Sequence, residues 1–389
     1  MSAMNYREQI ENIKKDGRYR RLRAISGAQG PELIVDGRKA ICLCSNNYLG
    51  LAGHPALAEA QARAARELGV GAGASRLISG NMDIHARLEE RIAHFKGIER
   101  VLLFSSGYQA NVGVISALVG RGDFIYSDQF NHASIVDGAR LSRAEIRVYP
   151  HRDTEALERM IAGDDSKGRK LIVTDSVFSM DGDLAPLDAI VKIKNRHGAM
   201  LMIDEAHATG VMGTGGKGLA VEMGCAGEID VTMGTLGKAL GGFGAFVGGS
   251  AQLVDYLINT ARSFIFTTAL PPSLAASALA AFDVIEAEPQ RIKRLLQNVK
   301  ILRKGMQKLG LNVPQGETPI IPLIIGDERK TMDICERLLD RGIFVQGIRP
   351  PTVPPDASRL RITVMSRHTK EHLERAIEAF KSLRSVIAE

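Results

Sequence analysis

The sequence predicts an α/β protein in which a large domain with a mostly parallel sheet precedes a smaller α+β domain. Short β-rich runs alternate with helical stretches of about ten to fifteen residues between residues 84 and 260, which is typical of repeated βαβ units. From Pro271 onward this alternation stops and the pattern becomes mixed. A chain of 389 residues, 45% hydrophobic and 24% charged, is typical of a folded protein and is too long for one ordinary core.

Residues 1–44 form the first expected segment, a polar helix followed by a hairpin. The hairpin is predicted because two apolar runs within 32–44 flank Asp36-Gly37, a pair that favours a tight β-turn. A further helix is expected at 55–69.

Residues 45–285 form the expected large domain. Its seven β-rich runs are separated mostly by helical stretches, which predicts a sheet covered by helices on both faces. The runs lie at 101–104, 124–127, 146–149, 171–174, 200–203, 231–233 and 245–247.

Residues 286–389 form the expected small C-terminal α+β domain. A long helical region at 271–310 leads into it. The elements expected after that region are a strand at 320–325, a helix at 329–341, strands near 343–346 and 359–364, and a closing helix.

The composition disfavours several classes of protein. No apolar run reaches the ~18–20 residues of a membrane span, and the polar N-terminus does not resemble a secretory signal. The four cysteines and nine histidines show no metal-ligand spacing, so we expect no metal site. We therefore expect a reduced, cytoplasmic protein that has no membrane partner.

The net charge of +6 is small for 389 residues, and both signs are interspersed, so nucleic acid is not expected as a partner. One local excess of positive charge lies at residues 14–23. This excess is either a solvated helix face or a basic lip that attracts an anionic substrate.

Two motif matches lack the context that their chemistry needs. Residues 204–207 spell DEAH, the Mg²⁺-binding box of some helicases, but the only phosphate-loop candidate, 232–239, lacks the first glycine and the final hydroxyl residue. Residues 213–218 match G-x-G-x-x-G, yet no strand leads directly into them, so we expect a flexible glycine loop. A nucleic-acid-binding protein with a DEAH box remains as a remote alternative.

Three features follow successive strands at their carboxyl ends, where open α/β sheets bind ligands. The turn at 105–108 opens a helix, and it is either an anion cradle or a simple serine N-cap. Asp204 ends an apolar strand, with His207 three residues beyond it, and burial of such an acid requires a partner. Lys238 lies among small residues, either as a surface lysine or as a desolvated amine suited to Schiff-base chemistry.

Together these three features predict a site for pyridoxal 5′-phosphate. The cradle would hold the phosphate, Asp204 would keep the pyridinium nitrogen protonated, and Lys238 would form the Schiff base. His132 also follows a strand end and is positioned to stack on the ring, although a lone histidine is more often structural.

These residues belong to a set of seven motifs that follow one another along the chain. The motifs lie at 45–51, 73–77, 106–111, 131–134, 177–183, 204–207 and 235–238. Through this series the chain resembles, over essentially its whole length, the α-oxoamine synthases. These are fold-type I pyridoxal-phosphate enzymes that condense an amino acid with an acyl thioester and release CO₂. The resemblance implies a PLP-dependent transferase fold with a mostly parallel seven-stranded sheet flanked by helices. It also implies a homodimer, in which a segment similar to 266–272 reaches the cofactor phosphate of the partner.

Within this family, residues 348–354 and 73–76 resemble the biotin-pathway branch. That branch joins L-alanine to a pimeloyl thioester, carried by acyl carrier protein or coenzyme A. Asn47 departs from the pattern, because many members of the branch have Asp there, and Asn suits the glycine acyltransferases equally well. A glycine C-acetyltransferase is therefore the alternative.

The resemblance implies catalytic roles for Lys238, His132, Asp204 and His207, and a cofactor contact for Ser179. Lys238 would carry the cofactor and remove the Cα proton, and Asp204 would pair with the pyridinium nitrogen. His207 and Ser179 would contact the phenolic oxygen of the cofactor. His132 would stack on the ring and assist proton transfer.

The resemblance also implies the remaining contacts. Gly107, Tyr108 and Thr235 would lie on the phosphate side of the cofactor. Arg361 would clamp the amino-acid carboxylate as a bidentate donor, which a lysine could not match. The implied substrate-binding residues are Arg20, Asn46, His132, Thr352 and Arg361.

Overall fold

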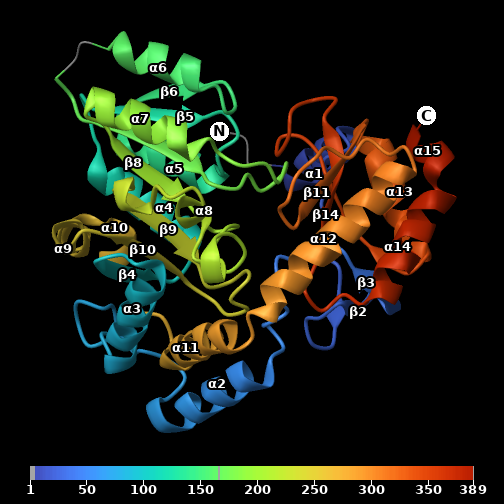
Figure 1. Cartoon of the computed structure of the whole chain (residues 1–389), viewed down its shortest axis with the longest axis horizontal. Coiled ribbons are helices and arrows are strands. Elements are labelled where there is room, and N and C mark those ends of the chain that lie inside the picture. The colour runs from blue at the N-terminus through green and yellow to red at the C-terminus, as the bar shows by residue number, and fades with distance from the viewer. Residues whose placement is uncertain (1–4, 165–166, 389) are drawn as a thin grey trace. The chain divides into compact units, whose positions relative to one another are not determined.

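The computed structural model describes residues 5–164 and 167–388, which pack into two compact units (Figure 1). Of the described residues, the small unit comprises 5–48, 180–182 and 293–388, and the large unit comprises 49–164, 167–179 and 183–292. In the described part of the chain, no helix has both the length and the apolar character to cross a membrane.

The large unit is built on the predicted seven-stranded sheet, whose strand order is β4-β10-β9-β8-β7-β5-β6. Neighbouring strands among β9, β8, β7, β5 and β6 run parallel, and β10 runs antiparallel to both of its neighbours. The strands are β4 (Arg100–Phe104), β5 (Phe124–Asp128), β6 (Glu145–Tyr149), β7 (Lys170–Asp175), β8 (Met200–Asp204), β9 (Val231–Thr235) and β10 (Ala245–Gly249). All seven expected runs therefore form strands of one mostly parallel sheet.

Both faces of this sheet are buried, which explains why its strands are apolar runs without alternation. One face packs against α4, α5 and α9 through a single core that includes Phe104, Ile115 and Val173. Side chains that point to the other face of the sheet, such as Ile172 and Leu201, are also completely buried. The helices that surround the sheet are α4 (Gly107–Leu118), α5 (Ala133–Ser142), α6 (Thr154–Ala162), α7 (Leu187–His197), α9 (Ala251–Thr260) and α10 (Arg262–Ile265).

A separate helical group completes the large unit. The helices α2 (Pro55–Leu68) and α3 (Asp83–Lys96) pack against α11 (Pro272–Ala287). The rings of Phe95 and Phe282, whose centroids are 4.9 Å apart, lie in this group. The expected helix at 55–69 is thus present as α2.

The small unit contains two sheets. One has the order β1-β2-β3-β12 and the other has the order β11-β14-β13. The strands are β1 (Ile25–Ser26), β2 (Glu32–Val35), β3 (Arg38–Cys42), β11 (Ile320–Gly326), β12 (Ile343–Phe344), β13 (Gln346–Ile348) and β14 (Ser358–Thr363). The helices are α1 (Tyr6–Lys15), α12 (Gln290–Lys308), α13 (Glu328–Asp340), α14 (Lys370–Ser382) and α15 (Arg384–Ala388).

The N-terminal hairpin shares a core with the C-terminal part of the chain. Strands β2 and β3 pair around Asp36 and Gly37, which both have positive φ (48° and 79°), as a two-residue hairpin turn requires. Leu33 and Val35 pack in one cluster with Leu339 and Met365. The described part of the expected N-terminal segment, residues 5–44, therefore belongs to the same compact unit as residues 293–388.

Two expected elements differ in detail. The single strand expected near 343–346 is two short strands, because β12 pairs with β3 whereas β13 pairs with β14 in the other sheet. The helical region expected at 271–310 is divided into α11 and α12, since the helix ends after Ala287.

A buried ion pair anchors the segment that follows β8. Lys96, at the end of α3, forms a short contact with Glu205, and both side chains are at most 2% exposed. Lys96 also donates to the main-chain oxygen of Lys217, and Glu205 accepts from the N–H of Ala220 at 3.0 Å. A Cβ on Gly218 would lie 2.1 Å from the Glu205 carboxylate. The glycine segment 213–218, expected to be a flexible loop, is therefore held against this ion pair.

We expect Lys96→Met to lower the free energy of unfolding by about 3–5 kcal/mol, because it leaves the Glu205 charge buried without its cation. The double variant Lys96→Met/Glu205→Gln should recover most of this loss, since no charge is then left unpaired. Lys381→Met, in an exposed pair with Glu378, is the control and should change stability by less than about 1 kcal/mol. Urea unfolding of the variants measures these differences, and equal losses for Lys96→Met and Lys381→Met would contradict the prediction.

A second charged cluster holds the loop that follows β7. The imidazole nitrogens of His151 lie 2.9 Å from Asp128 and 2.8 Å from Asp183, and Arg152 also contacts Asp183 at 3.1 Å. Burial opposes the charged imidazolium, but the hydrogen bonds and charges of the two carboxylates outweigh it and raise the pKa of His151 to about 9. His151 is therefore a cation at neutral pH that joins the ends of β5 and β6 to the β7–α7 loop.

This cluster predicts a pH dependence of stability. Because the folded-state pKa of His151 is raised, its contribution is complete below about pH 6.5 and is lost as the pH rises through about 9. His151→Gln should therefore lower the free energy of unfolding by about 1–2 kcal/mol at pH 6, after allowance for solvent screening, and by much less at pH 10. Chemical unfolding at both pH values tests this, and a constant difference would refute it.

Candidate active site

Two carboxyl groups lie side by side where β7 and β8 end. Asp175 and Asp204 are partners in the parallel register of these strands, and both are buried. The Asp204 carboxylate accepts hydrogen bonds from the Ala206 N–H and from Asn111 Nδ2, each at 2.8 Å. The predicted acid at the end of this strand is thus held by polar partners, as a buried carboxylate requires.

Lys238 lies in the loop that follows β9, beside the predicted histidine. Its Nζ is 2.8 Å from Nε2 of His207, which is buried. Thr235 fixes the start of this loop, because its hydroxyl accepts from the Gly237 N–H at 3.2 Å and donates to the Gly244 oxygen at 3.0 Å. Lys238 is thus a partly buried amine in contact with an imidazole, rather than an isolated surface lysine.

His132 caps the helix that follows β5. Its Nδ1 lies 2.8 Å from the Ser134 hydroxyl, and its main-chain N–H donates to Asp175 at 2.7 Å. Burial lowers the pKa of His132, with the charge of Asp204 acting against this shift and that of Lys238 adding to it. His132 is therefore a neutral imidazole at pH 7, placed near both of these charged groups.

The predicted anion cradle is the N-terminus of α4. Ser106 is its N-cap, and the serine hydroxyl accepts from the Gln109 N–H at 3.2 Å. Gly107 and Tyr108 begin the helix, and the phenol of Tyr108 is hydrogen-bonded to Asp137. The serine cap is therefore present, and it leaves the first main-chain N–H groups of the helix without intrahelical acceptors.

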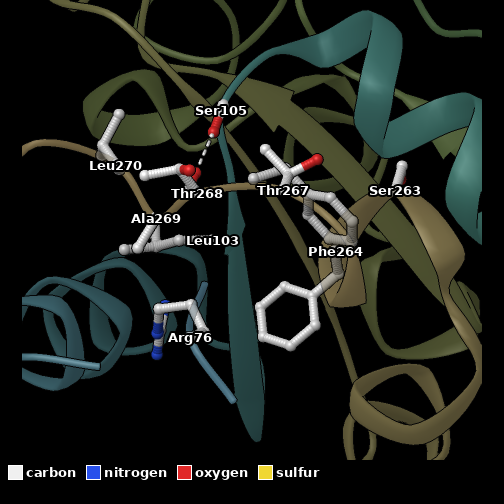
Figure 2. Close-up of a pocket in the computed structure, with 10 residues that line it drawn as sticks. Arg76, Leu103, Ser105, Ser263, Phe264, Thr267, Thr268, Ala269 and Leu270 are labelled. Atoms are coloured by element: carbon white, nitrogen blue, oxygen red, sulfur yellow. Dashed lines mark hydrogen bonds between the residues drawn. The ribbon is translucent and has the colours of Figure 1, made fainter. Parts of the chain in front are cut away.

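The segment that contains Thr267 and Thr268 runs beside this helix start, as Figure 2 shows. The Ser105 hydroxyl donates to the Thr268 oxygen at 3.5 Å, and the Ala269 N–H donates to the Ala74 oxygen at 3.0 Å. A small pocket of about 20 Å³, whose lining includes Ser105, Thr268 and Ala269, holds no more than a water molecule. Phe266 points outward with 70% of its surface exposed.

Ser179 lies half-buried in the β7–α7 loop, beyond the carboxyl end of β7. The large unit therefore places the predicted cofactor residues of this region at one edge of one sheet. These residues are Gly107, Tyr108, His132, Ser179, Asp204, His207, Thr235 and Lys238.

The predicted substrate residues other than His132 belong to the small unit. Arg361, in β14, is buried, and its Nη2 donates to Asn46 Oδ1 at 3.1 Å, so these two predicted residues are in contact. Arg20 and Thr352 line a single cavity of about 820 Å³, together with Arg349. Arg349 is buried, with 9% of the residue exposed, and its guanidinium donates to the main-chain oxygen of Tyr19.

The sequence patterns did not point to Asn111, Asp175 or Arg349 as site residues. Asn111 ends one of the motifs and Asp175 ends an apolar strand, as Asp204 does, so the position of Asp175 was a usable signal. The hydrogen bond between Asn111 and Asp204 spans 93 positions in the chain, and the sequence pattern carries no sign of it.

The arrangement in the large unit fits pyridoxal 5′-phosphate. The cofactor requires an amine for its aldehyde, an acid for its ring nitrogen and donors for its phosphate. Lys238, the buried Asp204 and the N-terminus of α4 offer these three groups at the same sheet edge. In the part of the chain that the structure describes, no cluster of His, Cys, Asp or Glu is suited to a metal ion.

Comparison with solved structures supports the fold and the cofactor. A serine palmitoyltransferase from S. paucimobilis, with a bound PLP–myriocin aldimine, is 29% identical and superposes with a TM-score of 0.94 over 99% of this chain and 98% of that chain. An 8-amino-7-oxononanoate synthase from Francisella tularensis is 29% identical, with a TM-score of 0.76 over 88% of this chain and 97% of that chain. The expected fold-type I architecture is confirmed.

Comparison of sequences identifies the family. Residues 38–380 match the model of the aminotransferase class I and II family. The 8-amino-7-oxononanoate synthase of Geobacter sulfurreducens is 52% identical over 95% of both chains, and that of Thermoanaerobacter pseudethanolicus is 46% identical over 97% of this chain and 96% of its own. The chain therefore belongs to the aminotransferase class I and II family and, within it, to the family of the 8-amino-7-oxononanoate synthases.

Proposed function

We propose that this protein is a pyridoxal-phosphate-dependent acyltransferase of biotin synthesis. It condenses L-alanine with a pimeloyl thioester to give 8-amino-7-oxononanoate, CO₂ and the free thiol of the carrier. The observation that carries this proposal is 52% identity, over 95% of both chains, to a protein named for that reaction. The contact of Lys238 with His207 beside the buried Asp204 supports it.

The reaction breaks three bonds: the alanine Cα–H bond, the thioester C–S bond and the bond from Cα to the carboxylate, which departs as CO₂. It forms the new carbon–carbon bond and a new Cα–H bond, and the departing thiolate takes up a proton from solvent. When bound, the cofactor supplies an electron sink that stabilises negative charge at Cα.

Lys238 is the proposed base for the Cα proton. Its Nζ lies 2.8 Å from His207 Nε2, so the imidazole orients the amine. The same amine returns a proton to Cα after CO₂ has left. The neutral imidazole of His132 is the proposed second proton carrier, which fits its lowered pKa.

Asp204 is the proposed partner of the cofactor ring nitrogen. Its two hydrogen bonds, from the Ala206 N–H and Asn111 Nδ2, hold the carboxylate rigidly without neutralising it. A fixed charge in a buried site stabilises a protonated ring nitrogen more strongly than it would in water.

The proposed substrate contacts lie in the small unit. Arg361, oriented by Asn46, binds the alanine carboxylate through its guanidinium. The cavity lined by Arg20 and Thr352 binds the acyl chain, and its positive charge fits the free carboxylate of a pimeloyl group. Acyl carrier protein and coenzyme A are both consistent with this proposal.

A homodimer in the cytoplasm completes the proposal. The exposed Phe266, next to Thr267 and Thr268, offers an apolar contact for a second copy of the chain. In such a dimer this segment would approach the cofactor phosphate of the partner. All four cysteines are free thiols, which is consistent with a reducing compartment.

Turnover with defined substrates tests the proposed function. We expect the purified protein with pyridoxal phosphate to release CO₂ and thiol from L-alanine plus pimeloyl-CoA, or from pimeloyl-acyl carrier protein. Glycine plus acetyl-CoA is the comparison, because Asn47 suits the glycine acyltransferases as well. A higher kcat/KM for glycine and acetyl-CoA than for either pimeloyl thioester would overturn the proposal.

Asp204→Asn should lower kcat about 10²- to 10³-fold, because the ring nitrogen then loses the charge that keeps it protonated. Asp230→Asn is the matched control, since Asp230 precedes β9 at the opposite end of the strands and pairs with Lys194 at 2.9 Å. The control should keep kcat within about threefold of the parent. Steady-state kinetics for both variants provide the measurement, and equal losses would contradict the role of Asp204.

A further inference from the structure

The carboxyl group of Asp175 is a second buried acid beside Asp204 that the proposed chemistry does not use. The two residues are register partners at the ends of β7 and β8, and they are only 2% and 3% exposed. The Ser176 hydroxyl and N–H both donate to the main-chain oxygen of Asp204, at 3.0 and 2.9 Å, so the two strand ends are fixed to each other. Two adjacent buried carboxyl groups cannot both be ionised without a large free-energy penalty.

The hydrogen bonds around the pair indicate which carboxyl group is ionised. Asp204 accepts from two donors, the Ala206 N–H and Asn111 Nδ2, whereas Asp175 accepts from the His132 N–H. Donated hydrogen bonds stabilise the charged form of a carboxyl group, so the arrangement favours the charge on Asp204.

The electrostatic environment agrees with the geometry. Burial and the charge of Asp204 raise the pKa of Asp175 well above its usual range, and Asp128 adds to this shift. The His132 N–H and the charge of Lys238 act in the opposite direction without cancelling it.

Asp175 also fixes the main chain at His132. The hydrogen bond from the His132 N–H to Asp175 Oδ2 measures 2.7 Å, and the Asp175 N–H donates to Asn131 Oδ1 at 2.9 Å. Asn131 in turn donates to the Val173 oxygen at 2.7 Å. These bonds tie the turn before α5 to the end of β7, and they set the position from which the His132 ring projects.

We propose that Asp175 is a positioning residue that remains protonated in the folded protein. The side-chain carbonyl oxygen of Asp175 accepts the hydrogen bond from the His132 N–H. Because the Asp175 side chain is neutral, Asp204 carries the only negative charge of the pair. This inference rests on the proposed function, because that function gives His132 and Asp204 their roles. It concerns only side chains of this protein.

Asparagine is the closest neutral substitute for a protonated aspartic acid, since it keeps the acceptor oxygen. Asp175→Asn should therefore bind pyridoxal phosphate within about threefold of the parent protein. Asp175→Ala removes the acceptor and should weaken cofactor binding by at least about tenfold, because the His132 turn loses its anchor. Failure of Asp175→Ala to fold, with Asp175→Asn folded, also supports the proposal, since the two variants differ in that acceptor.

Thermal unfolding of the holoprotein between about pH 5 and pH 8 tests the protonation directly. The unfolded chain releases the Asp175 proton above its ordinary pKa while the folded protein retains it, so the parent loses stability as the pH rises. Asp175→Asn lacks this loss, and its melting temperature should increasingly exceed that of the parent toward pH 8.

Asp123→Asn is the matched control, a variant whose effect should not change between pH 5 and pH 8. Asp123 pairs with Arg169 at 2.8 Å, and although burial works against the charge, these hydrogen bonds lower the pKa of Asp123. Above its ordinary pKa, Asp123 is ionised in both the folded and the unfolded state, so its loss should lower the melting temperature by a similar amount throughout this pH range.

The proposal is overturned if Asp175→Asn melts below the parent at pH 8, or if it weakens cofactor binding tenfold. It is also overturned if Asp175→Ala binds the cofactor as the parent does. None of these measurements uses the acyl or amino-acid substrates, so a failure of the proposed function would appear separately, in the turnover assay.

Discussion

The candidate site depends on one buried negative charge, the carboxylate of Asp204 at the carboxyl edge of a parallel sheet. A charge in such a place is stable only where donors surround it, and the structure supplies them from Ala206 and from Asn111 on α4. The neighbouring Asp175 must then stay neutral, because two adjacent carboxylates repel each other. The charge of Asp204 also acts on the pKa of His132, which it raises against the effect of burial. The protonation of both neighbouring side chains therefore depends on this one carboxylate.

The loops of the large unit are held by charged clusters that stand apart from the chemistry. Lys96 and Glu205 fix the glycine segment 213–218 and the turn that follows Asp204. His151, with Asp128 and Asp183, fixes the loop that contains Ser179. Since catalysis depends on small errors in position, rigid loops allow the residues of different strands to act as one site.

The small unit provides the arginines that the proposed substrates require. Arg361 is oriented by Asn46, and Arg20 lines a cavity with Thr352 and the buried Arg349. The N-terminal segment belongs to this unit because its hairpin shares a core with Leu339 and Met365. The local excess of positive charge at residues 14–23 thereby contributes Arg20, Arg21 and Arg23 to the wall of the cavity that we propose for the anionic acyl chain.

The sequence by itself determined the seven strands, the class of sheet and the chemical character of the site. Apolar runs buried on both faces leave a strong pattern, and Asp204, His207 and Lys238 lie within five positions of the ends of such runs. The antiparallel direction of β10, the division of 343–348 between two sheets and the union of the N-terminal hairpin with the C-terminal residues came only from the tertiary structure. The same holds for the contacts of Asn111 and Asp175, because they join residues far apart in the chain, where local periodicity carries no information.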